Sequence, residues 1–468
     1  MKQIKVGIVG LGLLGTSLAL ALKRAGEKYC VHAWARRHET LVWAQQNHVA
    51  DICCNDITQL LDAVDIVVLS VPVPAAVELL SACAACGRKD LIVTDIGSVK
   101  NDIMMAAAKF PELRFIGSHP MAGTEKSGCE AAFAGLYDNA DVFVTPGAKE
   151  DHSALEMCSQ MWRDAGCARI EVIAPEAHDE LVAATSHVLH LLASAMTLSI
   201  LDGRDAVNQR QHFAGCATGF RDTTRIASSN PRMWREIMES NTPAILDSLA
   251  RFEECFREFK QTLVERDFDK FESLFEHGKL LRGAWLGYKK PRPARVVLCG
   301  IKHCGKSSVG KELSDLLPAP LVDTDDMLAD VYAEKNGTRL TVREIYRTLG
   351  DEGFRKLENE CLERLADEPG AKVIALGGGA LSNPFVQEKT LSALGTTVWL
   401  DVPDSIAWER VKRGGIPPFL ADAPDPEAAF RAANAERKKQ FERHAALRVS
   451  PANGSSPRDT ALTILGQL

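Results

Sequence analysis

The stretch "IKVGIVGLGLLGTSLALALKRAG", residues 4–26, decides the fold of the N-terminal part of this chain. An apolar run leads directly into a GxGxxG spacing, and a helix-like apolar segment follows it. The first glycine allows a tight turn, the second lets a pyrophosphate approach the backbone, and the third lets helix and strand pack closely. We therefore predict a dinucleotide-binding turn made of Gly10, Gly12, Leu13, Leu14 and Gly15.

The end of the next expected strand indicates which dinucleotide is bound. A domain that selects NAD usually places an acidic residue there to bind the ribose hydroxyls. The sequence at 33–37 is instead "AWARR", which lacks a carboxylate and supplies two guanidinium groups. Guanidinium groups suit the extra 2′-phosphate of NADP. We expect NADP, bound by Arg36 and Arg37, with NAD as the alternative.

Hydrophobic periodicity divides the chain into three domains. Short apolar runs such as "DIVVLSVP" (65–72) alternate with amphipathic stretches up to about residue 175, which indicates a mostly parallel sheet flanked by helices. The pattern is then helical, and the alternation restarts at "RVVLCG" (295–300). We predict an α/β chain with a Rossmann-type domain at 1–175, a helical domain at 176–288, a proline-containing linker at 289–295 and a second α/β domain at 296–468.

Composition limits the classes of partner. The 46% hydrophobic content is that of a globular protein, and a net charge of -7 gives no basic footprint for nucleic acid. The CxxC at Cys83–Cys86 has no second pair to complete a zinc site. Scattered thiols and a start that runs at once into a strand lead us to expect a cytoplasmic protein without an export signal.

One segment has the length of a membrane span. Residues 181–201, "LVAATSHVLHLLASAMTLSIL", contain no Lys, Arg, Asp or Glu. They do contain several Ser, Thr and His side chains. We expect a buried helix of a soluble helical core, and no membrane.

Two strand ends carry the candidate chemistry of the first domain. "DIGSVK" (95–100) ends one strand and "GSHPMAGTEKSG" (117–128) follows another, and such ends border the ligand crevice of an open α/β sheet. His119, with Ser98 available from the neighbouring strand end, is well placed to take a proton from a substrate hydroxyl.

These motifs, with "HDELVAATSHVLH" (178–190) and "GFRDTTRIASSNPRMW" (219–234), resemble the prephenate dehydrogenase family, which includes the arogenate and cyclohexadienyl dehydrogenases. The resemblance covers roughly residues 1–288. It implies oxidative decarboxylation of prephenate or arogenate and a homodimer built by the helical domain. A different hydroxy-acid dehydrogenase is the alternative.

The resemblance also implies roles for single residues. His119 would deprotonate the ring hydroxyl of the substrate. Ser98 would orient His119 and lie near the nicotinamide. Arg225 would grip a substrate carboxylate with two hydrogen bonds. Three further residues would line or close the pocket: Ser186, His190 and Glu125. The family often has proline before its second histidine, whereas Leu189 stands there in this chain.

A second phosphate-binding turn begins the last domain. "GIKHCGKS" (300–307) satisfies GxxxxGK[ST] directly after a strand. Its backbone N–H groups would wrap the phosphates of ATP, Lys306 would reach the terminal ones, and the Ser307 hydroxyl would bind Mg²⁺. We assign nucleotide binding to Gly300, Gly305, Lys306, Ser307 and Ser308.

The phosphate acceptor is indicated by polar residues at later strand ends. Asp323 and Asp325 in "VDTD" suit the magnesium shell and a substrate hydroxyl, respectively. With "GDEGFRKLE" (350–358) and "VIALGGGA" (373–380), this set resembles shikimate kinase over roughly residues 295–468. The resemblance implies that shikimate is bound by Asp325, Arg355, Gly378 and Arg437.

Two departures from that family bear on activity. Pro417 stands where the family's lid carries an arginine, and His303 occupies a position in the phosphate-binding turn that is usually glycine. Arg410, Lys412 or Arg413 could replace the lid arginine. A nucleotide-sensing, catalytically weak module is therefore the alternative to an active kinase.

Overall fold

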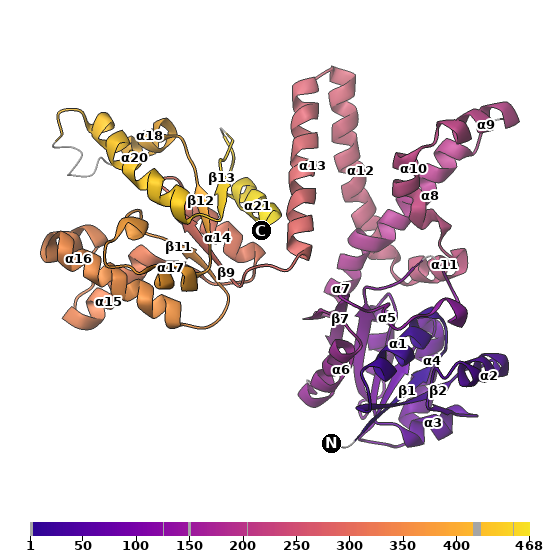
Figure 1. The fold of residues 1–468 in the computed structure, drawn as a ribbon. Coiled ribbons are helices and arrows are strands. Elements are labelled where there is room, and N and C mark those ends of the chain that lie inside the picture. Colours follow the sequence, from indigo (N-terminus) through magenta and orange to yellow (C-terminus); the bar gives the residue numbers. More distant parts are fainter. Residues whose placement is uncertain (1–2, 125, 148–150, 204, 415–422, 453) are drawn as a thin grey trace. The chain divides into compact units, whose positions relative to one another are not determined.

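The computed structural model describes residues 3–124, 126–147, 151–203, 205–414, 423–452 and 454–468. It divides into two compact units, Met1–Glu258 and Phe259–Leu468, which are described separately (Figure 1).

The first unit is built on an eight-stranded sheet with the order β3-β2-β1-β4-β5-β6-β7-β8. All of its neighbouring strands are parallel except β6 and β7. The order reverses beside β1, so a ligand crevice is expected outside the carboxyl ends of β1 and β4. The strands are β1 (Ile4–Val9), β2 (Tyr29–Trp34), β3 (Ile52–Cys53), β4 (Ile66–Leu69), β5 (Ile92–Asp95), β6 (Arg114–Pro120), β7 (Asp141–Pro146) and β8 (Arg169–Val172).

Helices cover both faces of this sheet (Figure 1). They are α1 (Leu13–Arg24), α2 (His38–Gln46), α3 (Ile57–Ala63), α4 (Val73–Ala85), α5 (Asn101–Ala107) and α6 (His152–Asp164). Ile8 and Leu18 belong to the apolar cluster that α1 covers, and Val67 and Leu80 to the cluster that α4 covers. Because both faces are buried at the middle of the sheet, a central strand such as β4 reads as a continuous apolar run.

The rest of the first unit is helical. It contains α7 (Pro175–Val182), a π-helical turn η2 (Ala183–His187), α8 (Val188–Leu201), α9 (Ala206–Gly215), α10 (Thr218–Thr224), η3 (Arg225–Ser228), α11 (Pro231–Ser240) and the start of α12 (Thr242–Glu265). One described helix, Pro175–Leu201, is long and apolar enough to cross a membrane by length and composition alone. Only 28% of its most apolar window is buried within the chain, so the expected burial is not found in the single subunit.

The second unit is built on a five-stranded sheet with the order β10-β11-β9-β12-β13, parallel throughout. Its strands are β9 (Arg295–Cys299), β10 (Leu321–Asp323), β11 (Lys372–Ala375), β12 (Thr396–Leu400) and β13 (Leu447–Val449). Its helices are α13 (Phe268–Lys289), α14 (Lys306–Leu316), α15 (Thr324–Asn336), α16 (Val342–Asp367), α17 (Glu388–Leu394), α18 (Asp404–Gly414), α20 (Pro426–His444) and α21 (Pro457–Gln467).

Helix α13 packs against the C-terminal helix α21. A side chain at Gly287 would come within 1.9 Å of the Leu465 carbonyl oxygen, so the two backbones touch there. Ala284 is buried in the apolar cluster of the second sheet, and Leu280 and Tyr288 pack against that cluster. The last turns of α13 therefore belong to the same core as the second sheet.

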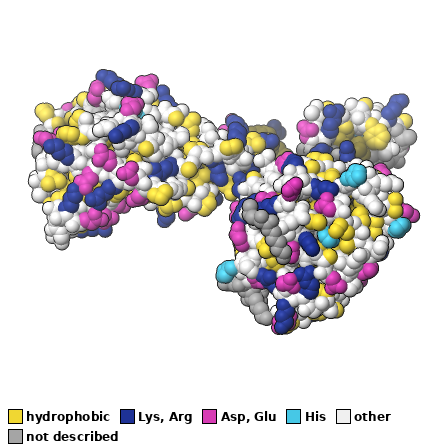
Figure 2. All heavy atoms as spheres, turned by 60° about the horizontal axis from the view of Figure 1, so that its bottom comes forward, with side chains coloured by type: hydrophobic (Ala, Val, Ile, Leu, Met, Phe, Trp, Pro, Cys, Tyr) yellow, Lys and Arg dark blue, Asp and Glu magenta, His cyan; other side chains and the backbone are white. Residues whose placement is uncertain are grey.

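Charge is mixed over the surface that Figure 2 displays. Lys and Arg side chains are interspersed there with Asp and Glu, and the face shows no continuous basic patch among the residues the structure describes.

Candidate active sites

The first glycine-rich turn is shaped for close approach of a ligand to backbone. Gly10 has φ 97°, and a side chain there would lie 2.4 Å from the Ser70 carbonyl oxygen. A side chain at Gly15 would lie 2.1 Å from the Gly10 oxygen, whereas Gly12 faces open space. Because α1 begins directly after Gly12, its free N–H groups point into that space. This donor set fits the pyrophosphate of a dinucleotide.

Arg36 and Arg37 follow the carboxyl end of β2, and both are exposed. Arg37 is the residue that precedes the first turn of α2. Both residues thus follow the carboxyl end of a strand, the edge of the sheet at which the crevice is expected.

His119 lies near the carboxyl end of β6, and its ring contacts a buried histidine of α7. Its Nδ1 is 2.9 Å from Nε2 of His178, and Nδ1 of His178 is 2.7 Å from Oδ1 of Asp179. Burial, reinforced by the nearby ammonium group of Lys100, holds the pKa of His119 well below its ordinary value. His119 is therefore neutral near pH 7 and able to accept a proton.

Asp179 is fixed by the start of α5. Its two carboxylate oxygens accept the backbone N–H groups of Lys100 and Asn101 at 2.8 and 2.9 Å. Lys100 is itself buried: its ammonium group forms an ion pair with Asp95 and donates to the Ser118 carbonyl oxygen at 2.9 Å. These contacts join α7 to the ends of β5 and β6, so the histidine pair is held rigidly.

Ser98 is half-buried in the loop after β5. Within the part of the chain that the structure describes, its hydroxyl makes no hydrogen bond to His119. Glu125 lies outside the described residues. Orientation of His119 in this structure therefore comes from His178, which the sequence analysis did not assign.

The helical domain gathers a second set of polar side chains around Trp234. Nδ1 of His190 donates to the Ser186 carbonyl oxygen at 3.0 Å, and its ring stacks on Trp234 with 3.8 Å between centroids. Burial and the positive charge of Arg225 lower the pKa of His190. Ser186, His190 and Arg225 are thus brought together, with Ser186 contributing its carbonyl oxygen. His187, three residues before His190, packs edge-on against the same indole.

The second glycine-rich turn forms a nest of backbone N–H groups at the start of α14. Gly300 and Gly305 have positive φ angles of 151° and 103°, and His303 takes the left-handed conformation at φ 64°. Nζ of Lys306 donates to the carbonyl oxygens of Gly300 and Ile301 at 3.0 and 3.1 Å. The turn therefore forms in spite of the histidine, at the cost of a strained backbone.

Arg410 binds the backbone of this turn. Its guanidinium group donates to the carbonyl oxygens of His303 and Cys304 at 3.1 and 3.2 Å. Lys412 forms an ion pair with Glu409. Arg410 is thus the candidate replacement for a lid arginine that the structure places against the turn, and Pro417 lies outside the described residues.

The metal-binding candidates contact one another. Oγ of Ser307 donates to Asp323 at 2.6 Å, and the other Asp323 oxygen accepts the Asp325 backbone N–H at 3.0 Å. Hydroxyl and carboxylate oxygens are the ligands that Mg²⁺ prefers. Lost hydration and the negative charge of Asp323 raise the pKa of Asp325. These residues fit a magnesium ion between the turn and the acceptor.

The acceptor candidates meet around a buried carboxylate. Glu358 is 6% exposed and accepts a hydrogen bond from Asn383 at 2.9 Å. Burial and the like charge of Arg355 lower the pKa of Arg437, which has no hydrogen-bond partner among the described residues. A side chain at Gly377 would lie 2.8 Å from Asp325 Oδ1 and 3.2 Å from Glu358 Oε1, so it would displace these carboxylates. Two neighbouring guanidinium groups favour an anionic ligand.

Family models match nearly the whole chain. Residues 18–172 match "Prephenate dehydrogenase, nucleotide-binding domain", residues 174–277 match "Prephenate dehydrogenase, dimerization domain", and residues 302–468 match "Shikimate kinase". The chain belongs to the prephenate dehydrogenase family and carries a fused shikimate kinase domain. The predicted fold class and both resemblances are confirmed.

Individual relatives agree with this assignment. Cyclohexadienyl dehydrogenase of Zymomonas mobilis is 32% identical over 291 residues, which are 62% of this chain and 98% of the relative. Shikimate kinase of a Synechococcus species is 34% identical over 172 residues, which are 36% of this chain and 85% of the relative. Prephenate dehydrogenase of A. aeolicus, crystallised with hydroxyphenyl propionate and NAD⁺, is 31% identical with a TM-score of 0.56, covering 60% of this chain and 98% of that one.

The dimerization domain explains the apolar surface of the helical region. Leu189, Leu198 and Phe256 are 48%, 65% and 62% exposed. A second subunit would cover side chains of this kind, so the apolar segment 181–201 has the composition of a buried helix without being buried in one chain. The family model accordingly suggests a dimer.

The dehydrogenase and kinase regions each contain polar residues that sequence reasoning missed. In the dehydrogenase they are His178, Asp179 and Lys100. The sequence signal for His178 and Asp179 is a His-Asp pair directly before an apolar helical segment. In the kinase they are Glu358 and Asn383, and Glu358 lies three residues after Arg355 on the same helix.

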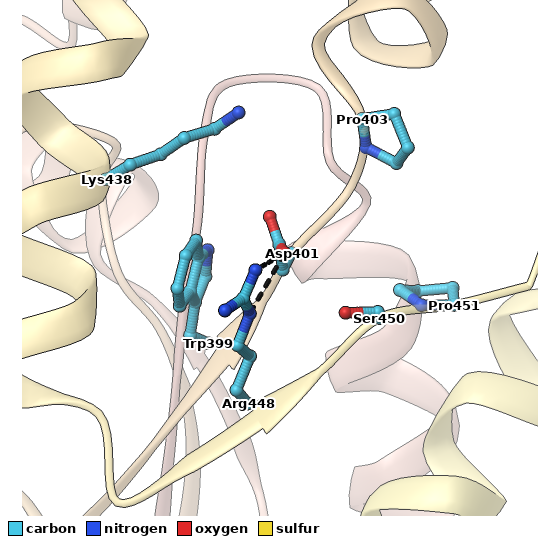
Figure 3. Close-up of a pocket in the computed structure, with 7 residues that line it drawn as sticks. All are labelled: Trp399, Asp401, Pro403, Lys438, Arg448, Ser450 and Pro451. Carbon is cyan, nitrogen blue, oxygen red and sulfur yellow. Dashed lines mark hydrogen bonds and ion pairs between the residues drawn. The ribbon is translucent and has the colours of Figure 1, made fainter.

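A hollow of about 400 Å³ in the kinase domain lies apart from the predicted site residues (Figure 3). The guanidinium group of Arg448 lies 4.5 Å from the centre of the Trp399 ring and pairs with Asp401 at 2.6 Å. Lys438 pairs with Asp404 at 2.8 Å. The charged side chains that line this hollow are already paired with carboxylates, so we assign no ligand to the hollow.

Proposed function

We propose that this chain is a bifunctional enzyme of aromatic amino-acid biosynthesis. Its N-terminal part would convert prephenate to 4-hydroxyphenylpyruvate with NADP, and its C-terminal domain would phosphorylate shikimate to shikimate 3-phosphate with ATP and Mg²⁺. The observation that carries the proposal is the neutral His119 at the crevice edge of a dinucleotide-binding sheet. Membership of both enzyme families supports it. We further propose a cytoplasmic homodimer.

The dehydrogenase step requires a base and a grip on the substrate. The bound nicotinamide supplies the acceptor for the hydride that leaves the ring carbon. Nε2 of His119 takes the proton of the ring hydroxyl, a role worth about 10²- to 10⁴-fold in rate. As the ring carboxylate leaves as carbon dioxide, its bonding pair stays in the ring, and His119 returns the proton to the phenol oxygen. Arg225 would hold the remaining carboxylate.

The kinase step depends mainly on positioning and charge neutralisation. The nest at Gly300–Lys306 would hold the phosphates, and Ser307 with Asp323 would hold Mg²⁺, which neutralises the charge that develops between the phosphates. Arg355 and Arg437 would bind the shikimate carboxylate. Asp325 would then orient the hydroxyl that attacks the terminal phosphate.

Each half of the chain has an alternative. For the dehydrogenase, arogenate is the alternative substrate and NAD the alternative cofactor. The strained His303 and Pro417 at the usual arginine position favour a slow, nucleotide-sensing kinase domain as the second candidate function.

Steady-state kinetics on the full-length protein tests both activities. We expect reduced-cofactor formation with prephenate, faster with NADP than with NAD, and shikimate-dependent release of ADP from ATP. No cofactor reduction with prephenate or arogenate would contradict the dehydrogenase. ADP release that is the same with and without shikimate would favour the sensing module.

A further inference from the structure

We propose that His178 and Asp179 position the base: they fix the proton of His119 on Nδ1, so that Nε2 faces the substrate unprotonated. They form a chain in which Asp179 holds His178 and His178 holds His119. This inference rests on the proposed dehydrogenase function and assigns roles to two residues outside the predicted site.

The hydrogen-bonding capacities of the groups determine the direction of the chain. A carboxylate can only accept, so Nδ1 of His178 carries the proton shared with Asp179 at 2.7 Å. A neutral imidazole has one N–H, which leaves Nε2 of His178 as an acceptor. That nitrogen is 2.9 Å from Nδ1 of His119, which must therefore donate. The lone pair of His119 is then on Nε2, the nitrogen that a substrate hydroxyl needs.

Asp179 is held in place by further hydrogen bonds. Its side chain accepts two backbone N–H groups at the start of α5, and its own carbonyl oxygen accepts the Asn241 amide at 2.8 Å. His178 is fully buried, and its ring also meets Phe143 of β7 edge-on at 5.6 Å. The chain is thus anchored by several elements of the first unit.

The charges that face His119 define the effect on its proton affinity. The titratable groups there are His178 on α7, which is neutral in this chain, Lys100 at the start of α5 and His187 in η2, and the charge of Lys100 is neutralised in part by Asp95. When His119 takes the substrate proton, its Nδ1–H remains bonded to His178, and the negative charge of Asp179 stabilises the resulting cation. His119 therefore binds a proton weakly in the resting enzyme, and Asp179 stabilises its protonated form during the transfer.

A matched pair of substitutions separates this role from packing. His178→Gln retains an acceptor oxygen near the place of Nε2, whereas His178→Phe keeps ring volume but has no acceptor. We expect His178→Phe to lower kcat for prephenate by about 10²-fold, in the range of lost general-base catalysis, with little change in KM. His178→Gln should keep roughly tenfold more activity than His178→Phe. NADP binding serves as the control for folding of the first domain.

The pH profile gives a readout that packing would not move. The wild-type rate should fall as acid protonates His119, at a pH below the ordinary histidine value because the pKa of His119 is lowered. His178→Phe removes the acceptor through which Asp179 stabilises the His119 cation, so in this variant the loss should move to lower pH. Equal kcat for the two variants, or an unmoved acid limb in His178→Phe, would overturn the inference while leaving the dehydrogenase assignment standing.

The tautomer can also be measured without turnover. ¹⁵N-histidine NMR of the full-length wild-type protein, with the His119 signals assigned from His119→Asn, reports which ring nitrogen carries hydrogen. We expect His119 protonated on Nδ1. Protonation on Nε2 would refute the chain even if no substrate were turned over, so failure of the inference and failure of the proposed function are distinguishable.

Discussion

The proposed role of Arg36 and Arg37 in cofactor selection can be tested directly, because both side chains are exposed after β2. We expect Arg36→Ala with Arg37→Ala to raise KM for NADP. Hydrogen bonds to a charged group contribute about 1.5–3 kcal/mol, so the rise should be roughly 10- to 100-fold. The same enzyme should keep its KM for NAD. A parallel rise for both cofactors would contradict the assignment of the 2′-phosphate to these arginines.

The sequence was sufficient to propose His119 as the base, but it did not indicate the residues that contact His119. His119 lies at the carboxyl end of a strand, where catalytic side chains gather in open α/β sheets. Its partner His178 is 59 residues away along the chain, on an element of the helical domain. No local pattern encodes that contact, since it depends on how α7 docks on α5. The same holds for Arg355 and Arg437, whose proximity depends on two separate helices.

Among the elements, hydrophobic runs predicted most strands but missed β3 and β13. The buried parts of β1, β4 and β9 are apolar and therefore recognisable. β3 has two residues and β13 three, which leaves little pattern, whereas the three-residue β10 was expected from "VDTD". The apolar segment 181–201 was expected to be buried, and this was wrong for the single subunit, in which 28% of its most apolar window is buried.

Helix α13 offers a matched pair of glycines for a test of its packing. Gly278 faces open space, whereas Gly287 touches α21. Alanine improves helix propensity by about 1 kcal/mol at either position. At Gly287 it also collides with the Leu465 carbonyl oxygen, and overpacking costs about 1–3 kcal/mol. We expect Gly287→Ala, unlike Gly278→Ala, to lower the temperature at which kinase activity is lost.

Heat inactivation of the kinase in each full-length variant measures this effect. Each kcal/mol should shift the midpoint by roughly 2–4 °C for a domain of this size. Equal midpoints for the two variants would mean that the contact of α13 with α21 does not contribute to kinase stability. The dehydrogenase rate at low temperature serves as the control for intact protein.

At the scale of the whole molecule, the two halves have separate cores. The apolar cluster around β9 and those around β1 and β4 have no residue in common. The restart of the alternating pattern after "KKPRPAR" was sufficient to predict two α/β domains, because each sheet produces its own apolar rhythm. The way α13 joins the second core could not be predicted, since its glycines have no meaning without their partner helix.

Separate cores predict separate activities, and two substitutions at opposite ends of the chain test this. Lys306→Ala removes the ammonium group that we propose reaches the terminal phosphates, so shikimate-dependent ADP release should be lost while prephenate oxidation keeps its wild-type rate. His119→Asn should have the reverse effect, lowering prephenate oxidation by about 10²- to 10⁴-fold at unchanged kinase rate. Both rates are measured on the same preparation, so each activity is the folding control for the other. Joint loss in either variant would show that the two sites are coupled, and the separation of their cores would then not extend to their chemistry.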